Sequence, residues 1–287
     1  MQFYLDTFII AFAYAAMGWG IFISLKIFNI PDITTDGSFT LGAAIISVVM
    51  PKFGWIIAMV ISLIGGFLAG CATGFFHTKL KVNALLSGII TMTALYSINL
   101  MIMGRSNIPL LGLSDIFSSV SIFNDVVFDK LLVIVVTLVV LGLILGLILT
   151  SDYGLSMRAT GNSESMIRAL GVNTDTRKIV GLGIANAFTA LSGGLVAQSL
   201  KFADINMGIG IVIFGLGAVM IGETLAQFFK IKSIVLYLPA VVMGCLIFRL
   251  LMAFCLQLGV DPNGLKLITA LFVLIFVSLP QFKKRFS

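Results

Sequence analysis

Polar stretches divide the chain into nine apolar segments, several of which are as long as a membrane-spanning helix. A helix needs about 20 predominantly apolar residues to cross a bilayer. Continuous apolar runs favour helices, whereas a membrane β-barrel shows short segments of alternating hydropathy. The pattern therefore predicts an all-α polytopic membrane protein, with 1–287 as one transmembrane domain. The predicted segments are 7–28, 38–50, 54–76, 83–103, 128–150, 179–200, 207–222, 233–256 and 265–280.

The composition supports a membrane location. Hydrophobic residues make up 59% of the chain and charged residues only 10%, whereas soluble domains carry roughly 25% charged residues. The N-terminus lacks the positive region of a secretory signal peptide, so we expect its apolar segment to be retained as a span. The three cysteines form no C-x-x-C pair, which argues against a metal or redox site.

The basic residues predict the orientation. If the tail QFKKRFS is cytoplasmic, nine crossings place the N-terminus outside. Twelve of the 18 lysines and arginines then lie inside, five lie outside, and Arg249 lies within a span. This distribution follows the positive-inside rule and explains the net charge of +6 without a nucleic-acid partner. The stretch 151–178 becomes the longest cytoplasmic loop.

A short helix is predicted within this loop. Asn162 or Ser163 can cap its N-terminus, and Glu164 in the first turn suits the positive end of the helix dipole. Glu164 and Arg168 form an i,i+4 pair, and Gly171 is suited to a left-handed C-terminal position.

The predicted loop helix has an apolar side formed by Met166, Ile167 and Leu170. A helix of two turns is marginal alone in water. We therefore expect another surface to hold this apolar side.

Two further segments, 30–49 and 202–222, share a rough plan and run in opposite directions in this topology. In each, Asp-Ile is followed by polar residues, glycines and a helix of small residues. Short glycine-interrupted segments in inverted halves point to a transport pathway, although close helix packing alone also explains the glycines. The polar pathway candidates are Thr34, Thr35, Ser38, Thr40, Asn99 and Asn206.

Motifs for chemistry are not found in the sequence. It has no G-x-x-x-x-G-K-[ST] phosphate loop for ATP binding, no catalytic Ser/His/Asp set and no His/Cys cluster for metal binding. The one histidine, His77, is expected at a cytoplasmic helix end. We therefore expect no catalytic residue, no metal and no cofactor in this chain, and no enzyme activity.

The cytoplasmic loop resembles a known family. Residues 155–173 read L-x-M-R-A-x-G-x-x-x-x-M-x-R-A-L-G-V-N, which is similar to the coupling loop of ABC importer permeases of the branched-chain amino acid and sugar class. Three other stretches resemble the narrower group of uncharacterised or tryptophan/tyrosine-type ABC permeases. They are PDITTDGSFTLGAA, LLSGIITMTALYSINLMIMGRSN and FADINMGIG with GLGAVMIGE.

The resemblance implies a function for the loop. It makes 164–171 a coupling helix that docks on a separate cytoplasmic ABC ATPase subunit, which uses ATP. It also implies an extracytoplasmic substrate-binding protein, a second copy of the chain as a homodimer, and the bacterial-type cytoplasmic (inner) membrane. The small solute is expected to be an amino acid, with aromatic ones favoured. The coupling residues are Arg158, Gly161, Glu164, Met166, Ile167, Arg168, Leu170 and Gly171.

Two other functions stay open. Inverted short segments also fit a self-sufficient secondary transporter driven by an ion gradient. A non-transporting membrane scaffold would use the loop to recruit a cytoplasmic protein. Uptake by the chain alone would favour the first, and loop binding without solute flux would favour the second.

Overall fold

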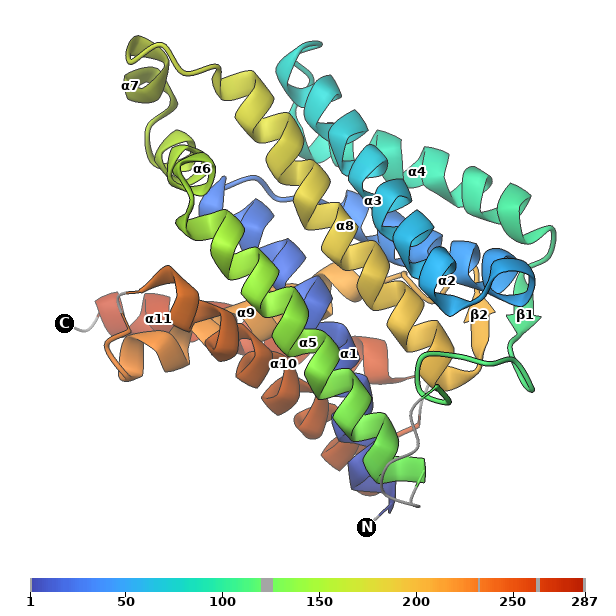
Figure 1. The fold of residues 1–287 in the computed structure, drawn as a ribbon. Coiled ribbons are helices and arrows are strands. Elements are labelled where there is room, and N and C mark those ends of the chain that lie inside the picture. Colours follow the sequence, from blue (N-terminus) through green and yellow to red (C-terminus); the bar gives the residue numbers. More distant parts are fainter. Residues whose placement is uncertain (1, 120–125, 232, 262–263, 286–287) are drawn as a thin grey trace.

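The fold is a bundle of long helices (Figure 1). The computed structural model describes residues 2–119, 126–231, 233–261 and 264–285. The long helices are α1 (Gln2–Phe22), α2 (Thr34–Phe53), α3 (Trp55–Thr78), α4 (Ala84–Met103), α5 (Val126–Thr150), α8 (Thr174–Leu200), α9 (Ile211–Phe228), α10 (Ile234–Gln257) and α11 (Leu265–Arg285). The short elements are a π-helical turn (Ile23–Ile27) after α1, the helices α6 (Asp152–Asn162) and α7 (Glu164–Ala169), and the strands β1 (Asn107–Pro109) and β2 (Phe202–Asp204).

Local sequence sets several helix ends. The side chains of Asn83, Ser151 and Asn173 accept hydrogen bonds from backbone amides in the first turns of α4, α6 and α8. Such caps satisfy donors that have no partner within the helix. Gly104 ends α4 in the left-handed conformation, which glycine adopts without a steric cost.

Helix α8 lies at the centre of the bundle. It crosses the molecule with α2 and α3 on one side and α1 and α5 on the other (Figure 1), and 83% of its apolar window is buried. Glycines allow this close packing: a Cβ on Gly42 of α2 would lie 1.8 Å from the Ala190 carbonyl oxygen of α8, and one on Gly193 would lie 1.9 Å from that of Phe39. The backbones of α2 and α8 are therefore in direct contact, as small residues permit between membrane helices.

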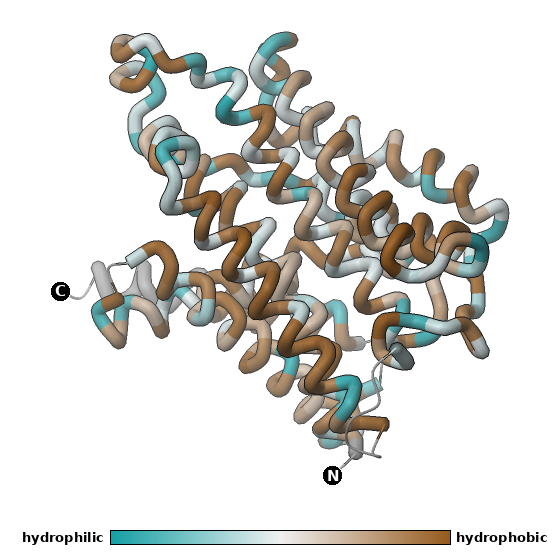
Figure 2. Tube along the Cα trace, in the orientation of Figure 1, coloured by the Kyte–Doolittle hydropathy of each residue, from teal (hydrophilic) through white to brown (hydrophobic). Residues whose placement is uncertain are grey.

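The outer helices present apolar side chains to their surroundings. Among the described residues, seven helices are long and apolar enough to cross a membrane, and the apolar windows of α3, α4, α5 and α10 are at most 33% buried. Figure 2 shows hydrophobic residues along these helices and hydrophilic residues mainly near their ends. The predicted segment 38–50 corresponds to α2, and 265–280 corresponds to α11, whose apolar part is Leu265–Phe276. Because every predicted segment falls on a helix, an α-helical polytopic membrane protein is confirmed.

One feature of the predicted segments is wrong. Segment 38–50 was expected to be short and interrupted by glycine, but α2 is a continuous helix of 20 residues that contains both Gly37 and Gly42. Its glycines face neighbouring helices instead of breaking the chain, since a Cβ on Gly37 would meet Leu95 of α4 at 2.9 Å. In the second segment, Gly208 and Gly210 do precede the helix, in a turn before α9.

The loops at the end of the bundle away from α6 and α7 are joined by a small sheet. Strands β1 and β2 pair antiparallel, with Asn107 opposite Asp204. The Nδ2 group of Asn107 also donates to the Asp204 carboxylate at 3.1 Å. Lys201, just before β2, forms an ion pair with buried Asp115. These contacts connect the end of α8 to the loop after α4.

Candidate functional site: the coupling loop and a polar helix interior

Helix α6 is fixed against the end of the first helix. The Asn29 side chain donates to the Gly161 carbonyl oxygen at 3.1 Å. A Cβ on Gly161 would lie 1.6 Å from the Ile27 carbonyl oxygen, so only glycine fits there. At the other side of α6, the Arg177 guanidinium of α8 lies 3.9 Å from the centre of the Tyr153 ring, a cation–π geometry.

Helix α7 follows directly, as predicted. Ser163 is extended at the N-cap position, although its side chain makes no capping hydrogen bond. The helix ends at Ala169, and Gly171 has a φ of +83°. The Val172 amide then donates to the Ile167 carbonyl oxygen at 3.3 Å, which turns the chain back towards α8.

The apolar side chains of α7 point in two directions. Met166 is 62% exposed and Leu170 is 69% exposed, whereas Ile167 is 8% exposed. Of the three residues predicted to form one apolar side, Ile167 is buried within the chain and the other two are exposed. Ile167 anchors the helix to the rest of the chain, and only Met166 and Leu170 are free to contact another protein.

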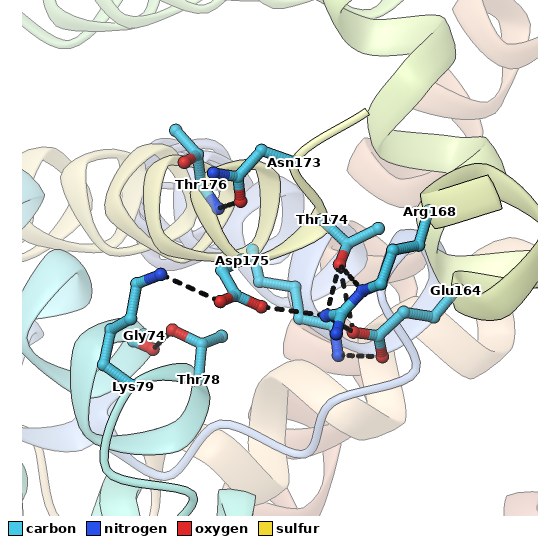
Figure 3. A network of polar contacts seen from close by, with 10 residues as sticks. Gly74, Thr78, Lys79, Glu164, Arg168, Asn173, Thr174, Asp175 and Thr176 are labelled. Atoms are coloured by element: carbon cyan, nitrogen blue, oxygen red, sulfur yellow. Dashed lines mark hydrogen bonds and ion pairs between the residues drawn. The ribbon is translucent and has the colours of Figure 1, made fainter. Parts of the chain in front are cut away.

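A network of charged groups holds α7 in place (Figure 3). Arg168 pairs with Glu164 at 2.9 Å and with Asp175 of α8 at 3.0 Å. Lys79, just after α3, pairs with the same Asp175 at 2.9 Å, and Lys178 pairs with Glu164 at 2.5 Å. The network therefore joins α7 to the start of α8 and the end of α3.

The network also perturbs its carboxyl groups. A hydrogen bond from Lys178 lowers the pKa of Glu164 below its usual value, and one from Lys79 lowers that of Asp175. Both carboxylates are stabilised in their charged form by neighbouring cations. The sequence indicated the Glu164–Arg168 pair, but Lys79, Asp175 and Lys178 lie too far along the chain to be found from helical spacing.

Arg158 lies elsewhere. It lines a cavity of about 240 Å³ under α6, together with Lys26 and Glu223. Its Nε atom is buried and has no hydrogen-bond partner within the described residues. Arg158 therefore lies apart from the exposed residues Met166 and Leu170 of the predicted coupling set.

Five of the six predicted pathway residues are buried, and three of these, Thr34, Thr35 and Ser38, lie at the start of α2. The hydroxyls of Thr34 and Thr73 lie 2.7 Å apart, and Ser38 donates to the Asn186 side chain of α8 at 2.7 Å. Thr35 donates to the backbone oxygen of Asp32 at 3.1 Å. These contacts satisfy polar groups between α2, α3 and α8, as buried groups require.

The other three pathway candidates differ in exposure, since Thr40 and Asn99 are buried and Asn206 is exposed. Thr40 and Asn99 line a small cavity of about 30 Å³ between α2, α4 and the turn before α9, together with Asp36 and Tyr96. The Asn99 amide donates to the Gly37 carbonyl oxygen at 3.1 Å, while its Oδ1 atom has no partner among the described residues. Asn206 is exposed in the turn between β2 and α9.

Sequence reasoning missed part of this region. Tyr96, which is 48% exposed, shares one face of α4 with exposed Thr93 and Ser97. The spacing of three and four residues places them together and could have indicated a polar stripe on an otherwise apolar helix.

The chain has apolar outer helices, polar groups between its inner helices, and an anchored helix beyond the bundle. These features fit a membrane transport protein of the multi-pass permease class. Residues 3–278 match the family described as "Branched-chain amino acid transport system / permease component". The chain therefore belongs to this family, the ABC permeases of the branched-chain amino acid and sugar class, and is a multi-pass protein of the bacterial inner membrane.

Individual relatives agree with this family. A tyrosine transport system permease protein of Clostridioides difficile (strain R20291) is 37% identical over 263 residues, which cover 91% of this chain and 86% of that protein. The uncharacterized protein RP368 of Rickettsia prowazekii (strain Madrid E) is 36% identical over 270 residues, 92% of each chain. A ribose import permease protein, RbsC of Haemophilus influenzae, is 25% identical over 188 residues, 64% of this chain and 56% of that protein. No solved structure matches the chain.

Proposed function

We propose that the chain is the membrane-spanning subunit of an ATP-driven importer for an aromatic amino acid, with tyrosine as the first candidate. The observation that carries the proposal is α7, a short helix ending at Ala169 whose Met166 and the following Leu170 are exposed, and which is held by ion pairs to the start of α8. Exposed large apolar groups at the end of a bundle indicate a protein contact. The partner is a cytoplasmic ABC ATPase, since the chain has no phosphate-binding loop of its own.

The contacts of α7 provide a route for mechanical coupling. Movement of the ATPase would displace α7, and the ion pairs of Asp175 and Glu164 would carry that displacement to α3 and α8. Because α8 is almost wholly buried against α1, α2 and α3, it passes the movement to the centre of the bundle. In the orientation with the N-terminus outside, α7 lies in the cytoplasm and the β1–β2 sheet lies outside, where a substrate-binding protein would dock.

A pathway between two copies of the chain fits the polar stripe on α4. Thr93, Tyr96 and Ser97 are exposed near the middle of α4, a helix whose apolar window is only 28% buried. Polar groups are costly against lipid and favour a protein contact or a water-filled cavity. We therefore place the α4 face towards a second copy, with the Thr40 and Asn99 cavity in the pathway wall.

The relatives support the proposed class of substrate. The tyrosine permease covers nearly the whole chain at 37% identity, whereas the ribose permease covers less of it at 25%. An aromatic amino acid is therefore favoured over a sugar.

The experiment is purification of the tagged chain from native membranes, followed by uptake of labelled tyrosine into liposomes. We expect an ATPase in near-equal amount, and uptake that requires ATP and the binding protein. Leucine and ribose serve as competitor controls. Uptake by the chain alone that follows an ion gradient would contradict the proposal, as would ATPase binding with no flux of any solute tested.

A further inference from the structure

A second polar site lies at the cytoplasmic ends of α1, α6, α9 and α10, away from α7. It is the cavity of about 240 Å³ that Arg158 lines, here called the Arg158 cavity. Phe22 and Tyr237 form part of its apolar wall, and their rings stack with centroids 6.0 Å apart. Its charged groups are Lys26, Arg158 and Glu223.

The charges leave one cation without a partner. Lys26 forms an ion pair with Glu223, so their charges offset each other. Arg158 makes no hydrogen bond or ion pair within the described residues, and its Nε atom is fully buried. A buried guanidinium donor without an acceptor is costly. The cavity therefore favours a ligand that brings an anionic oxygen to Arg158.

A separate apolar groove of about 380 Å³ lies between α1, α5 and α10, and some of its lining residues are close in sequence to those of the Arg158 cavity. Trp19 in the groove is one helical turn from Phe22 in the cavity, and Leu238 in the groove directly follows Tyr237. The Trp19 indole also donates to the Leu238 carbonyl oxygen at 3.0 Å. The groove is lined almost entirely by aliphatic and aromatic side chains, and two of its three helices, α5 and α10, are largely exposed.

We propose that the Arg158 cavity and the groove together bind one anionic phospholipid. The phosphate accepts hydrogen bonds from Arg158, and an acyl chain lies in the groove beside Trp19. Arginine binds phosphate oxygens through its planar set of donors, and basic pockets between membrane helices on the cytoplasmic side suit anionic headgroups. This site is separate from the α7 surface and from the α4 stripe.

Native mass spectrometry of the purified full-length chain tests the site. The chain is titrated with phosphatidylglycerol or with phosphatidylcholine of the same acyl chains, and we expect preferential binding of phosphatidylglycerol. Arg158→Gln should weaken that binding by about fivefold, the effect of one basic residue at an anionic lipid surface. Lys230→Gln is the matched control, because Lys230 is an exposed cation on the same side that does not line the cavity; it should change nothing.

Weaker lipid binding by Arg158→Gln could also result from misfolding, so a variant that is expected to bind lipid more tightly is needed. Glu223→Gln removes the one acidic group that lines the cavity and frees Lys26, so it should strengthen phosphatidylglycerol binding. Gly142→Leu fills the groove, where even a Cβ would lie 3.0 Å from the Trp19 ring, and should weaken binding of both lipids. Equal binding of the two lipids, or no response to Arg158→Gln and Glu223→Gln, would overturn the proposal. Displacement of phosphatidylglycerol by millimolar inorganic phosphate would assign the cavity to a free anion instead.

Discussion

The Asp36 carboxylate in the first turn of α2 caps the N-terminus of α9 through the amide of Gly210, 174 residues away. Its oxygens accept hydrogen bonds from the amides of Gly210 at 3.0 Å and Val212 at 2.8 Å. A Cβ on Gly208 would lie 2.1 Å from the Asp36 carbonyl oxygen, so the two helix starts are packed together. A carboxylate is well placed at this positive end of the α9 dipole.

Replacing Asp36 should destabilise the fold. Asp36→Ala leaves the α9 amides without an acceptor, and we expect a loss of about 1–3 kcal/mol in the free energy of unfolding. Asp36→Asn keeps one acceptor oxygen and should cost less. Thermal unfolding in detergent measures both variants against Asp6→Ala, which removes an exposed carboxylate near the N-terminus. Equal midpoints for Asp36→Ala and Asp6→Ala would show that the cap contributes nothing.

A charge at the tip of α7 should prevent docking of the ATPase. Leu170→Asp would place a carboxylate in an apolar contact, at a cost of several kcal/mol if it stays unpaired. We expect loss of the ATPase from the purified complex with normal membrane insertion. Leu111→Asp introduces the same charge at a residue that is 77% exposed near the opposite end of the bundle and should retain the ATPase. Normal recovery of the ATPase with Leu170→Asp would rule out this docking surface.

The stability contributed by Glu164 should depend on pH. Its pKa is lowered in the folded chain, so its contribution is present above the ordinary value of 4.5 and is lost as the pH falls through the lowered value. Because the side chain is 39% exposed, solvent screening limits the effect of Glu164→Gln at pH 7 to about 0.5 kcal/mol. Unfolding curves at pH 7 and pH 4 should show the difference between wild type and variant shrinking at the lower pH. If the difference in stability were the same at both pH values, the ion pairs of Glu164 would not be its cause.

Two loop glycines should respond differently to substitution. Gly161→Ala forces a Cβ into the Ile27 backbone and should separate α6 from the end of α1, which we expect to abolish coupled uptake. Gly171 has open space around it, so Gly171→Ala costs only its left-handed conformation, roughly 1–2 kcal/mol. Transport rates of the two variants provide the comparison. Equal losses would indicate that contact with Ile27 is unimportant.

The orientation can be tested by labelling. A cysteine at exposed Ser165 of α7 should react only with reagents that reach the cytoplasm, and one at exposed Asn206 should react from outside in intact cells. Both substitutions are made in a chain without Cys71, Cys245 and Cys255. Labelling of the Ser165 position from outside would reverse the topology.

The helices were predictable from the sequence because apolar length is a local signal. The ranges of α3, α4 and α10 agree with the predicted segments within two residues, and α7 followed from a capping position and from Gly171. The face that each helix turns inward was not predictable. Ile167 points inward because of where α6 and α8 lie, and Thr34 is buried because it meets Thr73 of α3.

The glycines show the same difference between local and long-range information. Gly37 and Gly42 suggested a broken segment because glycine weakens an isolated helix. Within the bundle they lie in a continuous α2, since the loss is offset by close contact with α4 and α8. The Asp36 cap joins residues far apart in sequence and leaves no periodic pattern that would have revealed it.

The glycine contacts of α8 also restrict how the chain can change shape. Gly42 and Gly193 bring the backbones of α2 and α8 together, and a Cβ on Gly70 of α3 would lie 2.1 Å from the Leu182 carbonyl oxygen of α8. If α2, α3 or α8 rotated about its own axis, a larger side chain would turn into the space that these glycines leave. Helices α2, α3 and α8 must therefore move as one solid body during a transport cycle, with bending confined to the connections at its two ends.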